Sequence, residues 1–314
     1  MRNFLILIIA LVTINSCKDR EQYKVAYTIA ENDLIPEGIT YSKTTNSFYI
    51  SSIYKKKIVK VDAKTGEYSD FNSSELGLQI LGMFVDEQRK QLWACGNITD
   101  HKKRYSAVIK LDLFTGDVIK RYEQVDTVHS MFNDLVLDKK GNIYFTNSSS
   151  QSIFKIDNET DSVIVFYENE EILSPNGITI SPDNQYLYIA AGMNGIKILD
   201  INKKIFVNTY NPSFNSKGID GLKFYKNSVI GIQNWVPKPS DRKICRYYLN
   251  KNGTDIISNE IIDQDNPYFD VPTTFVMVRN KLFCVANSQL LNFSDNKIKD
   301  PKALQDIIIL EYKL

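Results

Sequence analysis

The sequence predicts an all-β protein that folds as a six-bladed β-propeller with four-stranded blades. The first observation is composition: 18 Tyr and 16 Phe residues, with many Ile and Val, favour strands over helices. The second is a unit of roughly 45 residues that recurs along most of the chain, which is the spacing of propeller blades. The third is that each unit contains three clear strand-like runs and a less distinct fourth, separated by turn-forming residues.

Each unit follows the same order of strands and turns. A turn opens the unit, an apolar strand follows, and a polar turn leads into a second strand rich in Tyr or Phe. A third strand with a Lys-Ile-Asp-like ending comes next, as at 57–62, 107–112 and 153–157. Hairpin-forming sequences separate the strands at 64–66, 114–116, 138–142 and 182–184. The six units begin at residues 36, 81, 133, 176, 220 and 273, and the last of them is the weakest.

A further strand-like stretch, residues 23–29, precedes the first unit and has no partner within it. We expect it to complete the last blade beside residues 307–312, because a closed ring leaves no exposed strand edge. The competing architecture is a β-sandwich with appendages, which the sixfold repeat disfavours.

The N-terminus predicts export and lipid anchoring. Arg2 is followed by an apolar run over 4–12 that is too short to span a membrane comfortably and is typical of a secretory signal. The run ends at Ser16-Cys17, which resembles the bacterial lipoprotein box, in which the Cys is lipidated. This divides the chain into a lipoprotein signal peptide (1–16), a polar tether after lipidated Cys17 (17–22) and a propeller (23–314). An ordinary signal peptide with an incidental Cys17 is the alternative.

We therefore expect the protein to lie in the cell envelope, at the outer membrane or a periplasmic face, touching the membrane only through its anchor. The sequence contains 38 basic and 37 acidic residues, so no long-range attraction to nucleic acid is expected, and we expect a monomer. Cys95, Cys245 and Cys284 each sit in a strand-like run without metal-like spacing, which predicts small buried residues.

The residues that open the first strand of each unit carry the candidate chemistry, because the innermost strand of a propeller lines the central channel. We call these six positions the axial slots: Glu37, Leu81, Asn133, Asn176, Asp220 and Thr273. Four of them offer the hard oxygen ligands that suit Ca²⁺ or another divalent cation, whereas zinc prefers His and Cys. The alternative is turn chemistry, which explains Asn176-Gly177 and Asp220-Gly221 but not Glu37, since Glu is a poor turn residue.

These segments resemble the SMP-30/gluconolactonase/luciferin-regenerating-enzyme family of six-bladed propellers. The matching pieces are 36–38, 132–134 with 141–146, 174–177 with 181–183, and 219–221, and the likeness covers nearly all of 30–314. The resemblance implies that Glu37, Asn176 and Asp220 hold a catalytic metal. It also implies that Asn133 lies beside that metal, as a ligand or a substrate contact.

The chain departs from that family at informative positions. Sugar-lactone hydrolases of the family resemble one another in an Arg two residues before the Asn of the third blade, and here that residue is Met131. Other members use a His near the metal, and the candidate here is His129, four residues before Asn133. Asn234 and Thr273 belong to runs that resemble a less characterised branch, and we expect their side chains to line the pocket and contact substrate.

These features predict metal-assisted hydrolysis of a lactone or related small ester. The ion would be held by Glu37, Asn133, Asn176 and Asp220 and would polarise the carbonyl; Asp220, Glu37 or His129 would take the proton. No Gly-x-Ser-x-Gly motif occurs, so an acyl-enzyme route is not indicated. The second hypothesis is a binding propeller with a structural metal, whose recognition rim would be the inserts 97–106 and 235–243. A scaffold without metal is the third, and Leu81 and Thr273 are compatible with it.

Overall fold

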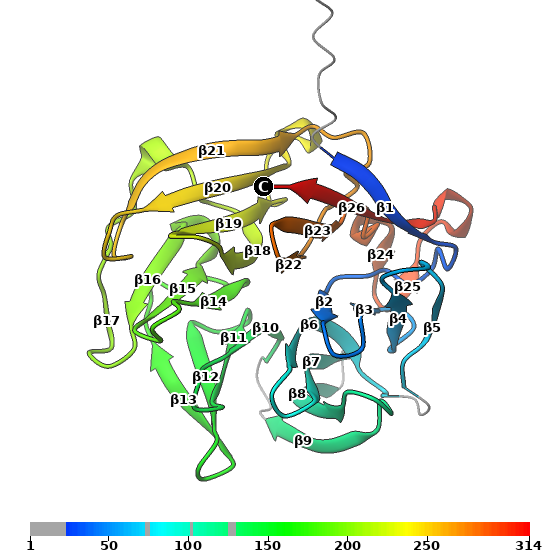
Figure 1. Ribbon diagram of the computed structural model, residues 1–314, viewed down its shortest axis with the longest axis horizontal. Coiled ribbons are helices and arrows are strands. Elements are labelled where there is room, and N and C mark those ends of the chain that lie inside the picture. Colours follow the sequence, from blue (N-terminus) through cyan, green and yellow to red (C-terminus); the bar gives the residue numbers. More distant parts are fainter. Residues whose placement is uncertain (1–22, 73–75, 101–102, 125–129) are drawn as a thin grey trace, which may run out of the picture.

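The protein is a six-bladed β-propeller. The computed structural model describes residues 23–72, 76–100, 103–124 and 130–314. Six four-stranded antiparallel sheets are arranged around a common axis, as the sequence predicted (Figure 1). The signal segment 1–16, the tether 17–22 with Cys17, and His129 all lie outside the described residues. Within the described part of the chain, no helix has the length and apolar character needed to cross a membrane.

The strands run outward from the axis in chain order within the first five blades. Blade one is β2 (Ile39–Ser42), β3 (Ser47–Ser51), β4 (Ile58–Asp62) and β5 (Tyr68–Asp70); blade two is β6 (Gln79–Asp86), β7 (Gln91–Asp100), β8 (Lys103–Asp112) and β9 (Val118–Gln124). Blade three is β10 (Phe132–Leu137), β11 (Ile143–Asn147), β12 (Ser152–Asp157) and β13 (Ser162–Glu168).

Blade four is β14 (Ile178–Ile180), β15 (Tyr186–Ala190), β16 (Ile196–Asp200) and β17 (Ile205–Phe206); blade five is β18 (Ile219–Phe224), β19 (Ser228–Gln233), β20 (Lys243–Leu249) and β21 (Ile256–Gln264). Blade six contains β22 (Phe275–Val278), β23 (Lys281–Val285), β26 (Ile307–Lys313) and β1 (Tyr23–Ile29). A short hairpin, β24 (Phe293–Ser294) and β25 (Lys297–Ile298), is inserted into blade six. Figure 1 shows β2, β6, β10, β14, β18 and β22 around the centre.

The two ends of the propeller close the ring in blade six. β1 pairs antiparallel with β26, from Tyr23 opposite Tyr312 to Ile29 opposite Ile307, as the sequence predicted. The outermost strand of this blade therefore comes from the N-terminal part of the chain and the three inner strands from the C-terminal part. Closure of this kind ties residues almost 300 positions apart into one sheet, and β1 covers the outer edge of β26.

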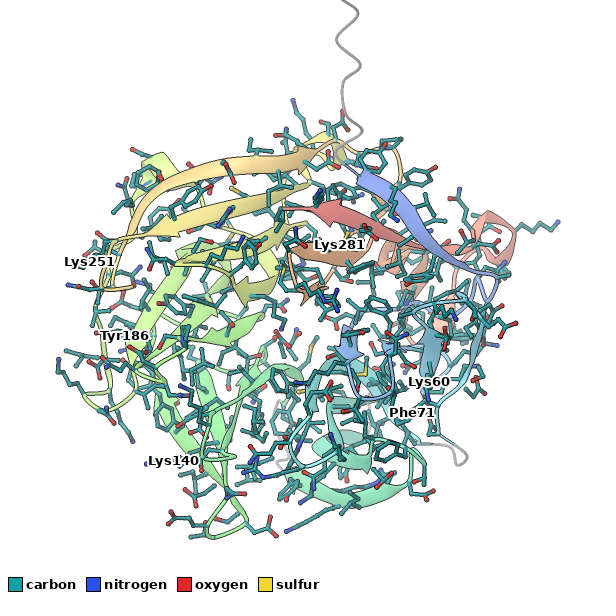
Figure 2. The ribbon with its side chains drawn as sticks, viewed as in Figure 1. Lys60, Phe71, Lys140, Tyr186, Lys251 and Lys281 are labelled. Atoms are coloured by element: carbon teal, nitrogen blue, oxygen red, sulfur yellow. The ribbon has the colours of Figure 1, made fainter. Side chains whose placement is uncertain are left out.

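Burial falls from the axis to the rim. Every residue of β3, β11 and β19 is buried, whereas all three of β5 are exposed. Side chains fill the space between the ribbons of neighbouring blades (Figure 2), and Phe48 of blade one packs against Phe283 of blade six with their ring centroids 4.7 Å apart. Cys95, Cys245 and Cys284 are free and buried, as expected. The inner strands thus supply the rigid frame from which the axial slots project.

The axial slots are held by contacts between neighbouring blades. The Gly177 N–H donates to the Asp220 carbonyl at 2.9 Å, and the Gly221 N–H donates to the Thr273 carbonyl at 3.1 Å. A Cβ built on Gly177 would lie 2.3 Å from the Asp220 oxygen, so only glycine permits this approach. Slot carbonyls therefore face the preceding blade.

Blades three and six use side chains for the same purpose. There the residue after the slot is Asp134 or Thr274. The Asp134 carboxylate accepts from the Ile178 N–H of blade four at 3.2 Å. The Thr274 hydroxyl accepts from the Ile39 N–H at 3.2 Å and donates to the Glu37 carbonyl at 2.8 Å. In these two blades a polar side chain therefore takes the place of the glycine that elsewhere lets the backbones of neighbouring blades come into direct contact.

The insert at 97–106 is not an irregular rim. β7 and β8 continue as a paired ladder through Asn97 and Ser106, which are both buried, and the Ser106 hydroxyl donates to the Asn97 side-chain oxygen at 2.6 Å. Asn97 in turn bonds both the N–H and the carbonyl of Phe132 in blade three. The strand pairing and the hydrogen bonds to blade three explain why the base of this polar insert is ordered β-structure. The insert at 235–243 contains only the short 3₁₀ turn η3 (Pro239–Asp241).

We predict that Gly177→Ala lowers the free energy of unfolding by about 3 kcal/mol, at the upper end of overpacking costs, because the new Cβ meets a backbone oxygen that cannot rotate away. Urea unfolding followed by circular dichroism measures the change. Gly77→Ala is the control: no atom lies within 4 Å of its Cβ, although its φ is 71°, so it should cost only about 1 kcal/mol of left-handed strain. Equal losses for the two variants would contradict the close-approach argument.

Candidate functional site

One mouth of the axial channel opens into a cavity of about 290 Å³. Its polar lining residues are Glu37, Asn133, Ser148, Ser174, Asn176 and Asp220, and its apolar ones are Ile53, Leu81, Met131, Ile219, Trp235 and Leu290, with Gly192 and Gly218 between them. Four sequence-predicted residues from four blades therefore share one cavity. The volume is at the lower end of the roughly 300–1,000 Å³ typical of small-molecule sites.

A left-handed residue two positions before the slot recurs in four blades. The residues and their φ angles are Ile35 (47°), Ser174 (47°), Gly218 (67°) and Val271 (53°). For the β-branched Ile35 and Val271 this conformation is strained, at about 1–3 kcal/mol each. The shared bend turns the chain sharply just before Glu37, Asn176, Asp220 and Thr273, so the backbone at the mouth is set by the ring as a whole.

Each of the four predicted ligand residues presents an oxygen with no hydrogen-bond partner. These atoms are Glu37 Oε2, Asn133 Oδ1, Asn176 Oδ1 and Asp220 Oδ1, and all four are buried. Buried polar atoms are almost always hydrogen-bonded, so each exception calls for an explanation. Four such oxygens belong to residues that line one cavity, which makes it the candidate site.

Neighbouring groups fix the other ends of these side chains. The Asn133 amide donates to Ser148 Oγ at 3.0 Å, and that hydroxyl donates to the Pro175 carbonyl at 2.6 Å. The Asn234 amide donates to Asp220 Oδ2 at 2.6 Å and to the Pro272 carbonyl at 2.8 Å. Because their amide or second oxygen is already bonded, Asn133 and Asp220 are held with a free oxygen in the cavity. Ser148 was not identified from the sequence, where nothing distinguishes it from other serines.

Thr273 does not have the position expected of a substrate contact. Its side chain is fully buried, it is not among the lining residues, and its hydroxyl donates to the Glu37 carbonyl at 2.7 Å. Thr273, the slot residue of blade six, thus holds the backbone of Glu37, the slot residue of blade one. Asn234 is also absent from the lining and is only 6% exposed; it orients Asp220 instead. The sequence correctly grouped these residues near the axis but could not distinguish supporting from lining positions.

The site accumulates negative charge. Burial raises the pKa of Glu37 well above its usual range, and the carboxylates of Asp220 and Asp134 raise it further. Burial likewise raises the pKa of Asp220 to about 7, against the lowering effect of its hydrogen bond from Asn234. The described lining residues include no Lys or Arg. Both carboxyl groups therefore ionise at a higher pH than ordinary surface carboxyl groups.

The one nearby cation is Lys223, on β18. Its ammonium contacts Asp134 Oδ2 at 2.9 Å, and the Asp134 side chain is only 3% exposed. Asp134 also accepts from the backbone N–H groups of Leu135 and Ile178. Lys223 thus pairs directly with Asp134, and it also lowers the pKa of Glu37, but burial and the carboxylates of Asp220 and Asp134 outweigh this effect. The sequence signal that could have found Lys223 is a lone cation within an inner strand whose other charged residue is Asp220.

The donor set suits a hard divalent cation. Two carboxylates supply charge, two amide oxygens supply neutral ligands, and all four have an unpaired atom in the cavity. Among the described residues no three or more His, Cys, Asp and Glu side chains are grouped so that they could hold a metal ion, and the candidate donor set therefore includes amide oxygens. The chemistry of this donor set is therefore compatible with a hard divalent cation.

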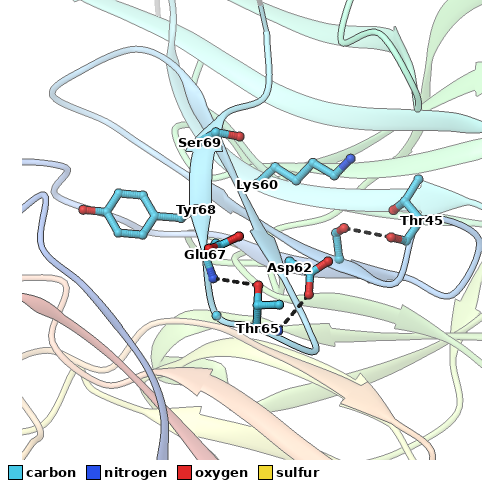
Figure 3. Close-up of a pocket in the computed structure, with 9 residues that line it drawn as sticks. Thr45, Lys60, Asp62, Thr65, Glu67, Tyr68 and Ser69 are labelled. Atoms are coloured by element: carbon cyan, nitrogen blue, oxygen red, sulfur yellow. Dashed lines mark hydrogen bonds between the residues drawn. The ribbon is translucent and has the colours of Figure 1, made fainter.

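A larger hollow of about 790 Å³ lies over the outer strands of blade one, between Lys60, Asp62 and Glu67 (Figure 3). Its Asp62 carboxylate accepts from the Lys64 and Thr65 N–H groups of its own hairpin turn, at 2.8 Å each. These bonds lower the pKa of Asp62, as expected of an ordinary turn carboxylate. The hollow therefore has turn chemistry and no convergent unpaired groups.

Comparisons with known proteins agree with this geometry. The profile described as SMP-30/Gluconolactonase/LRE-like region matches residues 35–203, just over half of the chain. The match includes Glu37, Asn133 and Asn176, whereas Asp220 lies beyond it. A search of the curated proteins found no match.

Solved structures share the architecture at low sequence identity. Mala s 1, the major allergen of Malassezia sympodialis, superposes with a TM-score of 0.66 at 15% identity, over 92% of this chain and 94% of its own. A gluconolactonase from Xanthomonas campestris gives 0.61 at 13%, over 92% and 87%. Regucalcin, a calcium-binding protein from Agrobacterium tumefaciens, gives 0.62 at 14%, over 92% and 95%. At these identities the likenesses show the fold alone.

We predict that Lys223→Met lowers the free energy of unfolding by about 3 kcal/mol, because it leaves the Asp134 carboxylate buried without a cation. Adding Asp134→Asn to that variant should recover at least about half of the loss. Urea unfolding measures all three proteins.

The matched control is Lys55→Met. Lys55 pairs with Asp33 at 2.6 Å, and the two side chains are 37% and 27% exposed, so its loss should cost less than about 1 kcal/mol. A Lys223→Met variant as stable as Lys55→Met would show that Asp134 does not depend on this ion pair.

Proposed function

The chain belongs to the SMP-30/gluconolactonase/LRE-like family, and from that premise we propose that it is a divalent-cation-dependent hydrolase of lactones or related small esters. The observation that carries the proposal is the group of four buried, unpartnered oxygens on Glu37, Asn133, Asn176 and Asp220. The gluconolactonase and the calcium-binding regucalcin among its structural neighbours are consistent with it.

Glu37, Asn133, Asn176 and Asp220 would hold the cation, and Ca²⁺ suits their oxygens best. Bound there, the ion would polarise an ester carbonyl and stabilise the negative charge that develops on its oxygen. The chain's own part is to present these oxygens without rearrangement. Ser148 and Asn234 fix the side chains of Asn133 and Asp220 through 3.0 Å and 2.6 Å bonds.

The proton released by the attacking water needs an acceptor, and Asp220 is the best placed of the described candidates. Asn234 holds its Oδ2, which leaves Oδ1 free in the cavity. Burial raises its pKa to about 7 in the cation-free protein, and a bound cation would lower that value. Glu37 is the second candidate, and His129 is a third that lies outside the described residues.

The alternative is a binding propeller in which the same cation is structural. Trp235, which lines the cavity and is 69% exposed, favours it, because an exposed Trp at a mouth suits ligand capture. The two functions share the cation site and differ only in turnover.

We predict that chelator-stripped wild-type protein binds Ca²⁺ in a calorimetric titration, and that Glu37→Gln and Asp220→Asn each weaken binding by about a hundredfold or more, because each removes one charged ligand. Asp62→Asn, in the hollow over blade one, is the control and should bind as wild type does. Binding that is absent in the wild type, or unchanged in both site variants, would overturn the proposed cation site.

Affinity should rise between pH 5 and pH 8. The raised pKa values of Glu37 and Asp220 mean that the cation-free site holds protons which the cation must displace. Hydrolysis of a lactone and ester panel should be lost on chelation and restored by Ca²⁺. Cation binding without turnover of any panel member would favour the binding function.

We also propose that the protein is exported and anchored through Cys17 as a monomer, with the propeller joined to the anchor by 17–22. The support is the Ser16-Cys17 lipoprotein box after an apolar run. In a bacterial host, radiolabelled palmitate should enter the wild type and Cys245→Ser, but not Cys17→Ser, which should leave the membrane fraction. Equal labelling of all three proteins, or of none, would contradict the anchor.

A further inference from the structure

The cavity has a polar side and an apolar side. Its polar side is formed by the slots of blades one, three, four and five, whose oxygens are buried. We call its apolar lining residues the apolar wall: Ile53, Leu81, Met131, Ile219, Trp235 and Leu290. A small ligand with its reacting carbonyl at the four oxygens has this wall around the remainder of its body.

The apolar wall is continuous with a packed hydrophobic cluster and so is rigid. Ile35, Ile53 and Leu81 are the buried centre of this cluster, and the partly buried residues packed on them are Met131, Leu290, Phe293, Ile298 and Leu304. Phe293 and Ile298 belong to the β24–β25 hairpin inserted in blade six, and Leu290 begins the 3₁₀ turn η4 (Leu290–Asn292) just before it. An insertion of the last blade therefore builds one side of the cavity.

A buried glutamine fixes this insertion. The Gln289 amide donates to the Asn32 and Gln305 carbonyls at 3.1 and 3.0 Å, and its side-chain oxygen accepts from the Gln305 N–H at 2.7 Å. Gln289 itself is left-handed, with φ at 59°, and only 3% exposed. These bonds join both ends of the insertion to the start of blade one, so Leu290 is held against the cavity.

Few lining groups can bond a ligand's hydroxyls. Ser148 already accepts from Asn133 and donates its proton to Pro175. Apart from Ser148 and the four slot residues, the polar side-chain groups among the described lining residues are the Ser174 hydroxyl and the indole N–H of Trp235, which lies at the mouth. A polyhydroxylated ring would place hydroxyls against Ile53, Leu81 or Met131, where each loses its water without gaining a partner.

We propose that the substrate is a lactone or ester whose body is apolar, alkyl or aryl, rather than a polyhydroxylated sugar lactone; this rests on the function proposed above. Met131 and Trp235 are the specificity-determining residues of the wall. Met131 carries a thioether where a charged or hydrogen-bonding side chain would accept a sugar. Trp235 offers a large apolar face at the mouth, where the ligand's far end lies.

The test uses lactams, which keep the ring and carbonyl of a lactone but resist hydrolysis. Unsubstituted, butyl-, hexyl- and trihydroxy-substituted δ-lactams are titrated by calorimetry into the whole protein with Ca²⁺ present. We expect affinity to rise about threefold to fourfold for each added CH₂ that reaches the wall. The trihydroxy lactam should bind at least about tenfold more weakly than the hexyl lactam.

Two variants assign the effect to the wall. Met131→Gln, nearly the same size, and Trp235→Ala, at a largely exposed position, should each weaken hexyl-lactam binding by about tenfold and leave the unsubstituted lactam within about twofold. Their controls are Met193→Gln and Phe114→Ala, at residues 53% and 59% exposed that do not line the cavity. Circular dichroism and urea unfolding establish that all four variants fold.

The outcomes separate this inference from the proposed function. Three results would each overturn the apolar substrate class: an affinity that does not depend on chain length, a trihydroxy lactam that binds as tightly as the hexyl lactam, or site variants that behave like their controls. A chain-length dependence with no turnover of the matching hexyl lactone would support the ligand class while overturning the hydrolase. Turnover of gluconolactone in preference to the hexyl lactone would support the hydrolase while overturning the apolar substrate class.

Discussion

The structure depends on close contact between neighbouring blades at the axis. Slot carbonyls point toward the preceding blade, where they meet a glycine, as Asp220 meets Gly177, or a side-chain hydroxyl, as Glu37 meets Thr274. Because the carbonyls are used in this way, the slot side chains are free to converge. Left-handed residues such as Ile35 sharpen the turn before the slot at a cost in local strain. The ring that closes the fold is therefore also what assembles the site.

In this arrangement the buried carboxyl groups that form the candidate site also destabilise the folded protein when they ionise. Glu37 and Asp220 are buried without a cation of their own among the described residues, and the pKa of each is raised as a result. The contribution of these two groups to stability is therefore greatest at low pH and is lost as pH rises toward about 7, since their folded state then binds more protons than the unfolded chain does. A divalent cation would reverse that dependence by binding only the folded site.

The fold leaves the chemistry open, because propellers with similar architecture include an allergen as well as a gluconolactonase. What distinguishes this chain lies in its site: four unpaired oxygens on one side and an apolar wall on the other. The wall comes from positions that carry no catalytic chemistry, including Met131 and the β24–β25 hairpin. In the proposed function the oxygens would hold the cation, and the wall would select the substrate.

The sequence by itself determined the architecture and the four oxygens, because both follow from a repeat: aligned copies place equivalent residues at equivalent points around an axis. The outer strands, such as β17 and β21, were less clearly predicted, since exposed strands have weak apolar alternation. It placed Thr273 and Asn234 in the pocket, whereas the structure uses them to hold Glu37 and Asp220. Only the tertiary structure decided which side chains line the cavity, paired Asp134 with Lys223 across 89 residues, and brought the blade-six insertion against Leu81. These contacts join residues from different blades, and no local periodicity encodes such distant pairings.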